Sequence, residues 1–209
     1  LGYPKVIAAC PTCAATLEEL CEIPATTLFE VLAEESAPSP APPNVLPENM
    51  VLHHACGARH ASAVKESVLA LAQRAGLSLQ GDSLPQDQHP CCGYGGLTPF
   101  VSREIADAMT EAGLAQLLQG KSSTPVLTYC VNCRDRYLAS GQEAWHILEF
   151  LYPATANVNR KSPTWSQRQE NRAQLKASLQ AGLWGKKNPK EPAMKLYLHP
   201  ELEAKIEDT

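Results

Sequence analysis

The sequence predicts an α/β fold, in which short strands alternate with helices. The first observation is a repeat: residues 6–17 and residues 126–137 each contain a short β-type run, then Cys-x-x-Cys, then a helical pattern. The second is helical periodicity on both sides of a turn-rich loop, over residues 62–76 and 101–118. This order places the cysteines where strands end and helices begin, which is where ligand sites collect in α/β proteins.

The repeat extends beyond the cysteines. Residues 28–32 (Leu-Phe-Glu-Val-Leu) match residues 147–151 (Ile-Leu-Glu-Phe-Leu), so each cysteine pair is followed by a comparable amphipathic helix. The offset is 120 residues for the cysteine pairs and 119 for these helices. Two features at nearly one offset favour duplication of a module. In the second copy, residues 50–54 predict a strand just before Cys56.

The pattern divides the chain into four segments. Residues 1–35 are predicted to be the C-terminal remnant of a first module, residues 36–49 a proline-rich connector, and residues 50–153 a complete second module. Residues 154–209 hold 10 Lys and Arg against 6 Asp and Glu, where residues 1–153 hold 8 against 16. We expect a basic, mostly helical tail. Because both ends lack a natural start or cap, we expect a piece of a longer protein, with its first module truncated.

Charge and hydropathy argue against several classes of function. The acidic body offers no basic stripe that would neutralise phosphates, so we expect no nucleic-acid partner. No apolar run reaches the roughly 18 residues of a membrane span, and no secretory signal pattern opens the chain. We therefore expect a cytoplasmic protein, on its own or bound to the inner face of a membrane complex. Clustered cysteines there indicate metal or redox chemistry, with a disulfide-stapled secreted protein as the alternative.

The placement of the eight cysteines points to one class of site. Five of them lie in the complete module: Cys56, then Cys91 and Cys92 followed by Gly93, then Cys130 and Cys133. A Cys-x-x-Cys turn at a helix start brings two thiolates to one centre. Five thiols with a vicinal pair exceed the four ligands of tetrahedral zinc. An iron–sulfur cluster spreads its ligands over several ångströms and suits the set better, with zinc as the alternative.

With 34 residues between Cys56 and Cys91 and 37 between Cys92 and Cys130, the arrangement resembles the cysteine-rich CCG domain of the disulfide-reducing subunit of heterodisulfide reductase and of related iron–sulfur oxidoreductase subunits. These relatives include subunits of glycolate, lactate and glycerol-3-phosphate oxidising systems. The resemblance covers about residues 50–152 as one module and residues 1–35 as the end of a preceding one. Tandem CCG-type modules are usual in such proteins, in agreement with the repeat.

The resemblance implies a cofactor, a substrate and partners. The cofactor would be an iron–sulfur cluster, a noncubane 4Fe–4S cluster in the best-described members, held by Cys56, Cys91, Cys92, Cys130 and Cys133 beside Gly93. Cys10 and Cys13 would be the closing pair of metal ligands of the first module. The implied function is reduction of a disulfide, with flavin- or ferredoxin-type electron-transfer subunits or fused domains as partners. The alternatives are an electron-transfer subunit of a 2-hydroxy acid or glycerol-3-phosphate dehydrogenase system, and a zinc-holding structural module.

His53 is the candidate catalytic residue. The family often reads Tyr-His-Asp-Pro-Cys-His at its first cysteine, where this chain reads Leu-His-His-Ala-Cys-Gly over residues 52–57. The histidine is kept as His53, and His54 replaces the acidic residue. We predict that His53 supplies a proton at the site, with a packed core histidine as the alternative. Cys21 is expected to be buried on an apolar helix face, and His89 to lie in an exposed polar loop.

Overall fold

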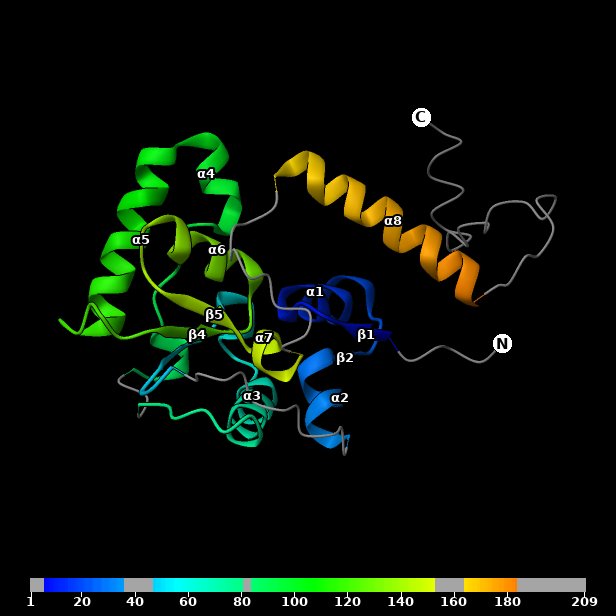
Figure 1. Ribbon diagram of the computed structural model, residues 1–209, viewed down its shortest axis with the longest axis horizontal. Coiled ribbons are helices and arrows are strands. Elements are labelled where there is room, and N and C mark those ends of the chain that lie inside the picture. Colours follow the sequence, from blue (N-terminus) through cyan, green and yellow to red (C-terminus); the bar gives the residue numbers. More distant parts are fainter. Residues whose placement is uncertain (1–5, 36–46, 81–83, 153–163, 184–209) are drawn as a thin grey trace. The chain divides into compact units, whose positions relative to one another are not determined.

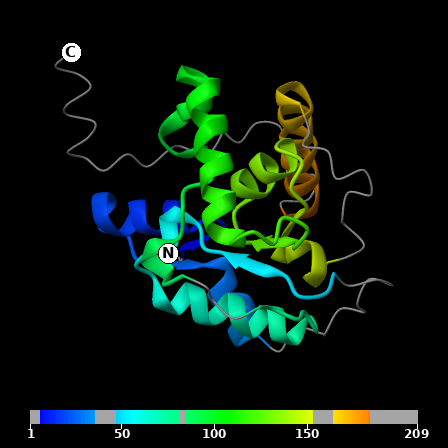
Figure 2. The same ribbon diagram turned by 90° about the vertical axis from the view of Figure 1, so that its left-hand side faces the viewer.

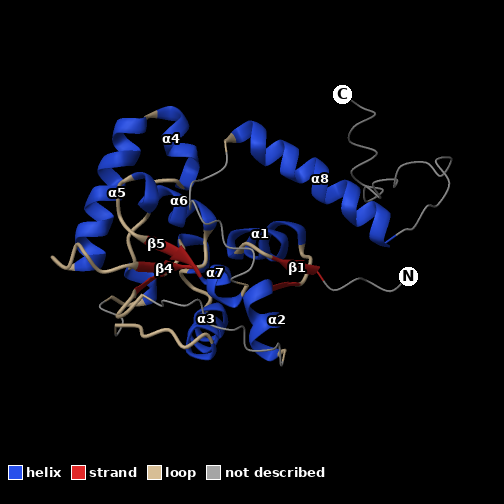
Figure 3. Cartoon of the chain, in the orientation of Figure 1, coloured by secondary structure: helices blue, strands red, loops and turns tan. Residues whose placement is uncertain are grey.

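Short parallel strands with helices packed against them make up the fold in the computed structural model, which describes residues 6–35, 47–80, 84–152 and 164–183 (Figure 1). The strands are separated along the chain by helices, and a further helix lies in the C-terminal part (Figure 3). The predicted α/β class with a helical C-terminal part is therefore confirmed. Contacts divide the chain into two units, residues 1–162 and residues 163–209.

The first unit contains all the described strands. They are β1 (Val6–Ala8), β2 (Ala25–Thr27), β3 (Val51–His53), β4 (Val126–Thr128) and β5 (Ala144–His146). Its helices are α1 (Pro11–Cys21), α2 (Leu28–Glu34), α3 (Ser62–Arg74), α4 (Thr98–Val101), α5 (Arg103–Leu118), α6 (Val131–Ala139) and α7 (Ile147–Leu151). Three short 3₁₀ helices complete it: η1 (Cys56–Ala58), η2 (Gln86–Gln88) and η3 (Gly95–Leu97).

A three-stranded parallel sheet, in the order β3-β4-β5, forms the centre of the second module. Alternate side chains point to opposite faces of a strand, and both faces are apolar here. Leu52 and Leu127 pack with α3 and α7 on one face, whereas Val51 and Val126 pack with α5 and α6 on the other. Figure 2 shows α3 and α5 on opposite sides of the strands. Because both faces of the sheet are buried, the sequences of its strands are mostly apolar, as is usual for parallel strands.

The predicted repeat is a repeat of structure. β1-α1-β2-α2 and β4-α6-β5-α7 follow the same order, and in each the two strands pair in parallel. The helix after the second strand starts with a capping box in both copies: Thr27 with Glu30, and His146 with Glu149. A reciprocal bond of this kind satisfies two of the free N–H groups at a helix start. The two copies thus share the same type of helix cap as well as the same topology.

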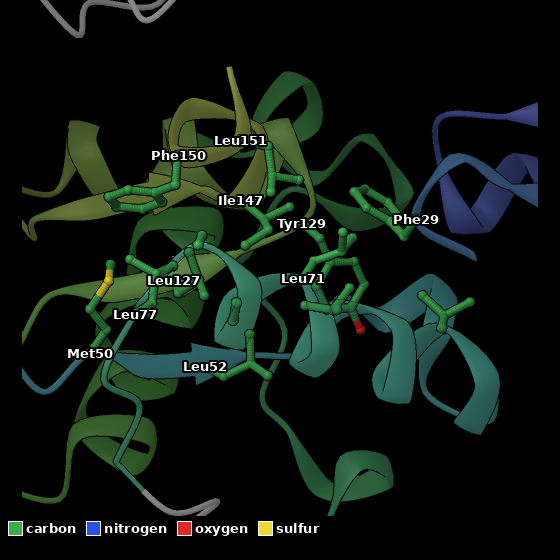
Figure 4. Close-up of a cluster of buried hydrophobic side chains, with 14 of the residues drawn as sticks. Phe29, Met50, Leu52, Leu71, Leu77, Leu127, Tyr129, Ile147, Phe150 and Leu151 are labelled. Carbon is green, nitrogen blue, oxygen red and sulfur yellow. The ribbon is translucent and has the colours of Figure 1, made fainter. Parts of the chain in front are cut away.

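Residues 6–35 pack against the second module. Phe29 of α2 is fully buried in the same apolar cluster as Leu71 of α3, and its ring meets that of Tyr129 edge to face at 5.6 Å between centroids (Figure 4). A second contact joins α1 to η1, where Thr12 lies so close to Gly57 that a side chain on Gly57 would overlap it. The two modules therefore share a core and meet at the start of η1.

The helix expected over residues 101–118 is found as α5, with its start at Arg103. α4 ends at Val101 and α5 begins at Arg103, because Ser102 is extended and its hydroxyl accepts a hydrogen bond from the N–H of Ile105. Most of the expected connector, residues 36–46, lies outside the described residues. So do residues 154–163 and 184–209 of the expected tail.

The second unit is described over residues 164–183, where α8 (Trp165–Leu183) lies. Thr164 and Gln167 hydrogen-bond each other's backbone N–H groups at the start of the helix. Leu175 and Leu179 of α8 are exposed. Across the parts of the chain that the structure describes, no helix combines the length and apolar character needed to cross a membrane.

Candidate metal centre

The five predicted ligands of the complete module come together at the carboxyl end of the three-stranded sheet. Cys56 opens η1 shortly after β3, and Cys130 is the N-cap of α6 shortly after β4. Parallel strands end at the same edge of a sheet, so these two loops meet. Cys91 and Cys92 reach the same place from the loop between α3 and η3, and Cys133 from the first turn of α6.

Pairwise contacts join the five thiols in the order Cys56, Cys91, Cys92, Cys133 and Cys130, which we call the thiol series. Cys91 hydrogen-bonds with Cys56 and with Cys92, Cys92 with Cys133, and Cys133 with Cys130. Cys56 is exposed, Cys92 and Cys133 are buried, and Cys130 is half-buried, so the series enters the core from the surface at Cys56. Within the described ranges, no three His, Cys, Asp or Glu side chains converge on a position for one metal ion.

Cys91 is the member of the series most strongly held as a thiolate. Hydrogen bonds from the Cys56 and Cys92 thiols hold its pKa far below the usual range, and the N–H of Gly93, 3.4 Å from the Cys91 sulfur, adds to this effect. The same hydrogen bond raises the pKa of Cys56, because Cys56 is the donor. A thiolate is the ligand form of cysteine, so the loop is prepared for a metal.

Cys130 is the second lowered thiol. The Cys133 thiol, followed by the N–H groups of Cys133 and Asn132, lowers its pKa to about 6 against the opposing effect of burial. These N–H groups lie in the first turn of α6, where helix amides have no partner within the helix. The helix start therefore contributes to the lowered pKa of Cys130, after the larger effect of the Cys133 thiol.

These pKa directions predict an order of thiol reactivity in the reduced, metal-free chain. At pH 7, iodoacetamide should alkylate Cys91 and Cys130 about tenfold faster than Cys56 and Cys13, because the thiolate is the nucleophile. Cys56 and Cys13 have raised pKa values, although both are more exposed. Peptide mapping by mass spectrometry after short labelling measures the order. Exposure alone predicts the reverse, so faster labelling of Cys56 and Cys13 would contradict the assigned electrostatics.

Gly93 allows the cysteine loop to approach α5. Its φ is +82°, and a Cβ placed there would overlap the carbonyl oxygen of Ala106 and lie 2.9 Å from the Thr110 hydroxyl oxygen. On the facing side, a Cβ on Gly113 would lie 2.9 Å from the carbonyl oxygen of Cys91. Two glycines, one on each surface, therefore set the distance between loop and helix.

His53 holds the loop that carries the vicinal cysteines. Its side chain lies on the same strand face as Val51 and is fully buried. Nε2 lies 2.9 Å from the carbonyl oxygen of Pro90, and because a carbonyl only accepts, Nε2 carries the proton. Burial lowers the pKa of His53 to about 4, so the ring is neutral at pH 7. Its predicted role as a proton donor stays a prediction, and the contact with Pro90 gives it a positioning role.

His89 was expected in an exposed loop, and this expectation is wrong. It is buried, and Nδ1 accepts a hydrogen bond from the His54 N–H at 3.2 Å while Nε2 donates to the carbonyl oxygen of Leu84 at 3.1 Å. The His54 ring in turn meets the Tyr129 hydroxyl at 3.1 Å. The only available sequence signal was position, since His54 and His89 each lie within two residues of a predicted ligand. His54 and His89 therefore help to fix the position of the loop that carries Cys91 and Cys92.

A second polar network, also not foreseen, ties α5 and α6 to Cys92. The Thr110 hydroxyl lies 2.8 Å from the Cys92 carbonyl oxygen and accepts a hydrogen bond from Arg136 at 2.6 Å. Arg136 also pairs with Asp107 at 2.9 Å. Thr110 is fully buried, so this network fixes the backbone of the buried cysteine in the loop.

The cysteines of the first module form a pair of their own. Cys10 is the N-cap of α1 and Cys13 lies one turn further on, as Cys130 and Cys133 do in α6. A hydrogen bond with Cys10 raises the pKa of Cys13. Their role as metal ligands stays a prediction. Cys21 was expected to be buried, which is wrong: it is exposed at the end of α1.

One comparison with known proteins gives a match. Residues 50–135 match the sequence model of the CCG cysteine-rich domain. The matched range begins just before β3 and ends in the first half of α6, so it includes the whole thiol series. No curated protein and no solved structure matches the chain. Sequence match and clustered thiols agree on residues 50–135, and over this range the chain is similar to the CCG cysteine-rich domain.

Proposed function

We propose that the second module binds an iron–sulfur cluster through Cys56, Cys91, Cys92, Cys130 and Cys133. The protein would serve as a redox subunit that passes electrons to a thiol or disulfide substrate, as the resemblance to the disulfide-reducing subunit of heterodisulfide reductase implies. The observation that carries the proposal is the thiol series. Five cysteines from three separate segments contact one another in succession at one sheet edge.

The donor set fits a cluster better than a single zinc ion. Tetrahedral zinc needs four ligands around one point, and no such convergence exists among the described side chains. A cluster accepts ligands that are spread over its several iron atoms. Two members, Cys91 and Cys130, have lowered pKa values and are ready to bind as thiolates. The 4Fe–4S type, cubane or noncubane, rests on the resemblance.

Different residues of the chain have different roles around the site. When bound, the cluster supplies one-electron redox chemistry. Cys92 and Cys133 lie in the core and exclude water, whereas the exposed Cys56 marks the side from which a substrate sulfur would approach. His53 and Thr110 hold the two vicinal cysteines through the carbonyl oxygens of Pro90 and Cys92. Electrons would come from flavin- or ferredoxin-type partners, in a reducing compartment such as the cytoplasm.

Anaerobic reconstitution with ferrous iron and sulfide tests the proposal. The chain is expected to take up about four iron and four sulfide, with visible absorption and a paramagnetic signal on reduction or oxidation. Cys92→Ser and Cys133→Ser should each lose most of the bound iron, whereas Cys21→Ser, at an exposed thiol outside the series, should keep it. A wild-type chain that binds zinc without sulfide under these conditions would overturn the proposal.

A second measurement separates disulfide reduction from electron transfer alone. A small dithiol and its disulfide are added to the reconstituted protein, and the paramagnetic signal is recorded. A signal that changes with the thiol or disulfide supports direct chemistry at the cluster. A signal that ignores both supports the alternative, an electron-transfer subunit beside a 2-hydroxy acid or glycerol-3-phosphate dehydrogenase.

A further inference from the structure

Tyr137 is a buried polar group that the site described above does not use. It lies on α6, one helical turn beyond Cys133, and its side chain is fully buried in the apolar cluster that also contains Cys92 and Cys133. Among the described residues its hydroxyl has no hydrogen-bond partner. Buried hydroxyl groups in native proteins are nearly always satisfied, so an unsatisfied one calls for a partner from outside the chain.

The surroundings of the hydroxyl point to a sulfur acceptor. The Tyr137 ring meets the His53 ring edge to face, with centroids 5.1 Å apart, and this contact fixes its direction. The buried cluster around Tyr137 contains the side chains of Cys92 and Cys133, and Cys130 packs against it. A phenolic O–H is a hydrogen-bond donor, so Tyr137 can donate to a sulfur atom at this site.

We propose that Tyr137 donates its phenolic O–H to a sulfur of the bound cluster or of a ligating thiolate, and thereby raises the reduction potential of the centre. This inference rests on the proposed function. A hydrogen bond to sulfur stabilises the more negative, reduced state over the oxidised one, and such bonds are among the determinants of iron–sulfur potentials. Tyr137 is then a positioning and tuning residue, built into the same helix as two of the ligands.

The test compares Tyr137→Phe with wild type in the reconstituted protein. At a fixed ambient potential the ratio of reduced to oxidised cluster should fall about tenfold, equivalent to a potential lower by about 59 mV for a one-electron couple. Tyr152→Phe is the control: it removes the same group from Tyr152, which is exposed, follows α7 and lies outside the thiol series. In that variant, the ratio of reduced to oxidised cluster at the same ambient potential should stay within about twofold of the wild-type ratio.

Two further measurements separate tuning from a structural role. In deuterated solvent, the paramagnetic cluster should show coupling to an exchangeable deuteron that is lost in Tyr137→Phe and kept in Tyr152→Phe. Without metal, Tyr137→Phe should melt at or above the wild-type temperature, because the change removes an unpaired buried hydroxyl.

The outcomes that overturn the inference are distinct from failure of the proposed function. An unchanged potential and an unchanged deuteron coupling in a reconstituted Tyr137→Phe protein reject the role of Tyr137 alone. A metal-free Tyr137→Phe that melts well below wild type rejects it as well, since the hydroxyl would then have a partner in the chain. A wild-type protein that takes up no iron and sulfide rejects the proposed function, and the inference with it.

Discussion

Gly93→Ala should lower the free energy of unfolding by about 3–4 kcal/mol, a large share of the stability of a domain of this size. A left-handed conformation costs a residue with a Cβ about 1 kcal/mol, and φ at Gly93 is +82°. The rest comes from the overlap of the new methyl group with the Ala106 carbonyl, which is helix backbone and yields only if α5 moves. Urea titration of the metal-free chain, followed by circular dichroism, measures the loss.

Gly96→Ala is the matched control for this prediction. Gly96 lies in the same loop at a φ of +65°, but no atom lies within 4 Å of a Cβ placed there. Its loss should stay near the 1 kcal/mol of the backbone conformation alone. Equal losses in the two variants would show that loop and helix yield easily, and would reject Gly93 as the residue that sets their distance. The N–H of Gly93 also contacts the Cys91 sulfur, so iron uptake should fall in parallel.

The fold was predictable from the sequence to the extent that local patterns specify it. Two Cys-x-x-Cys pairs with matching helices behind them were enough to predict the repeat, because strand, cap and helix signals are all short-range. Ser102 shows the limit of such patterns. The apolar period continues through it, but the serine hydroxyl caps α5 and ends the helical segment before it.

The site was predictable only where its chemistry fixes residue types. Cysteine spacing identified the thiol series, since few functions need vicinal thiols and a later Cys-x-x-Cys. The buried position of His89 includes a hydrogen bond from the His54 N–H, and these two residues are too far apart in the chain for a local pattern to relate them. The prediction for Cys21 was wrong in the opposite direction: its helix face is apolar in sequence, but the side chain is exposed at the end of α1. Tertiary contacts decide burial, and local patterns do not report them.

Gly57→Ala should lower the free energy of unfolding by about 2–3 kcal/mol, through a contact between the two modules. Gly57 follows Cys56 in η1, and a Cβ there would overlap the Thr12 hydroxyl and come within 2.8 Å of the Thr12 Cβ. The φ angle of Gly57 lies outside the left-handed region, so an alanine there is not strained by the backbone. The loss of stability in Gly57→Ala therefore measures the overlap with Thr12 alone. Hydrogen exchange should rise in α1, which has to move, and stay low in α3.

A double-mutant cycle with Thr12→Ala makes the prediction specific. Thr12 is exposed, so its own replacement should change stability by less than about 0.5 kcal/mol. In the double variant the hydroxyl, which is the closest contact, is gone and only the longer contacts with the carbon atoms of residue 12 remain, so about half of the loss should be recovered, as a coupling of about 1 kcal/mol. Strictly additive losses would mean that α1 does not press on η1. Because Cys56 precedes Gly57 directly, recovery of stability should be accompanied by recovery of iron uptake, which would tie the placement of this ligand to the module that precedes it.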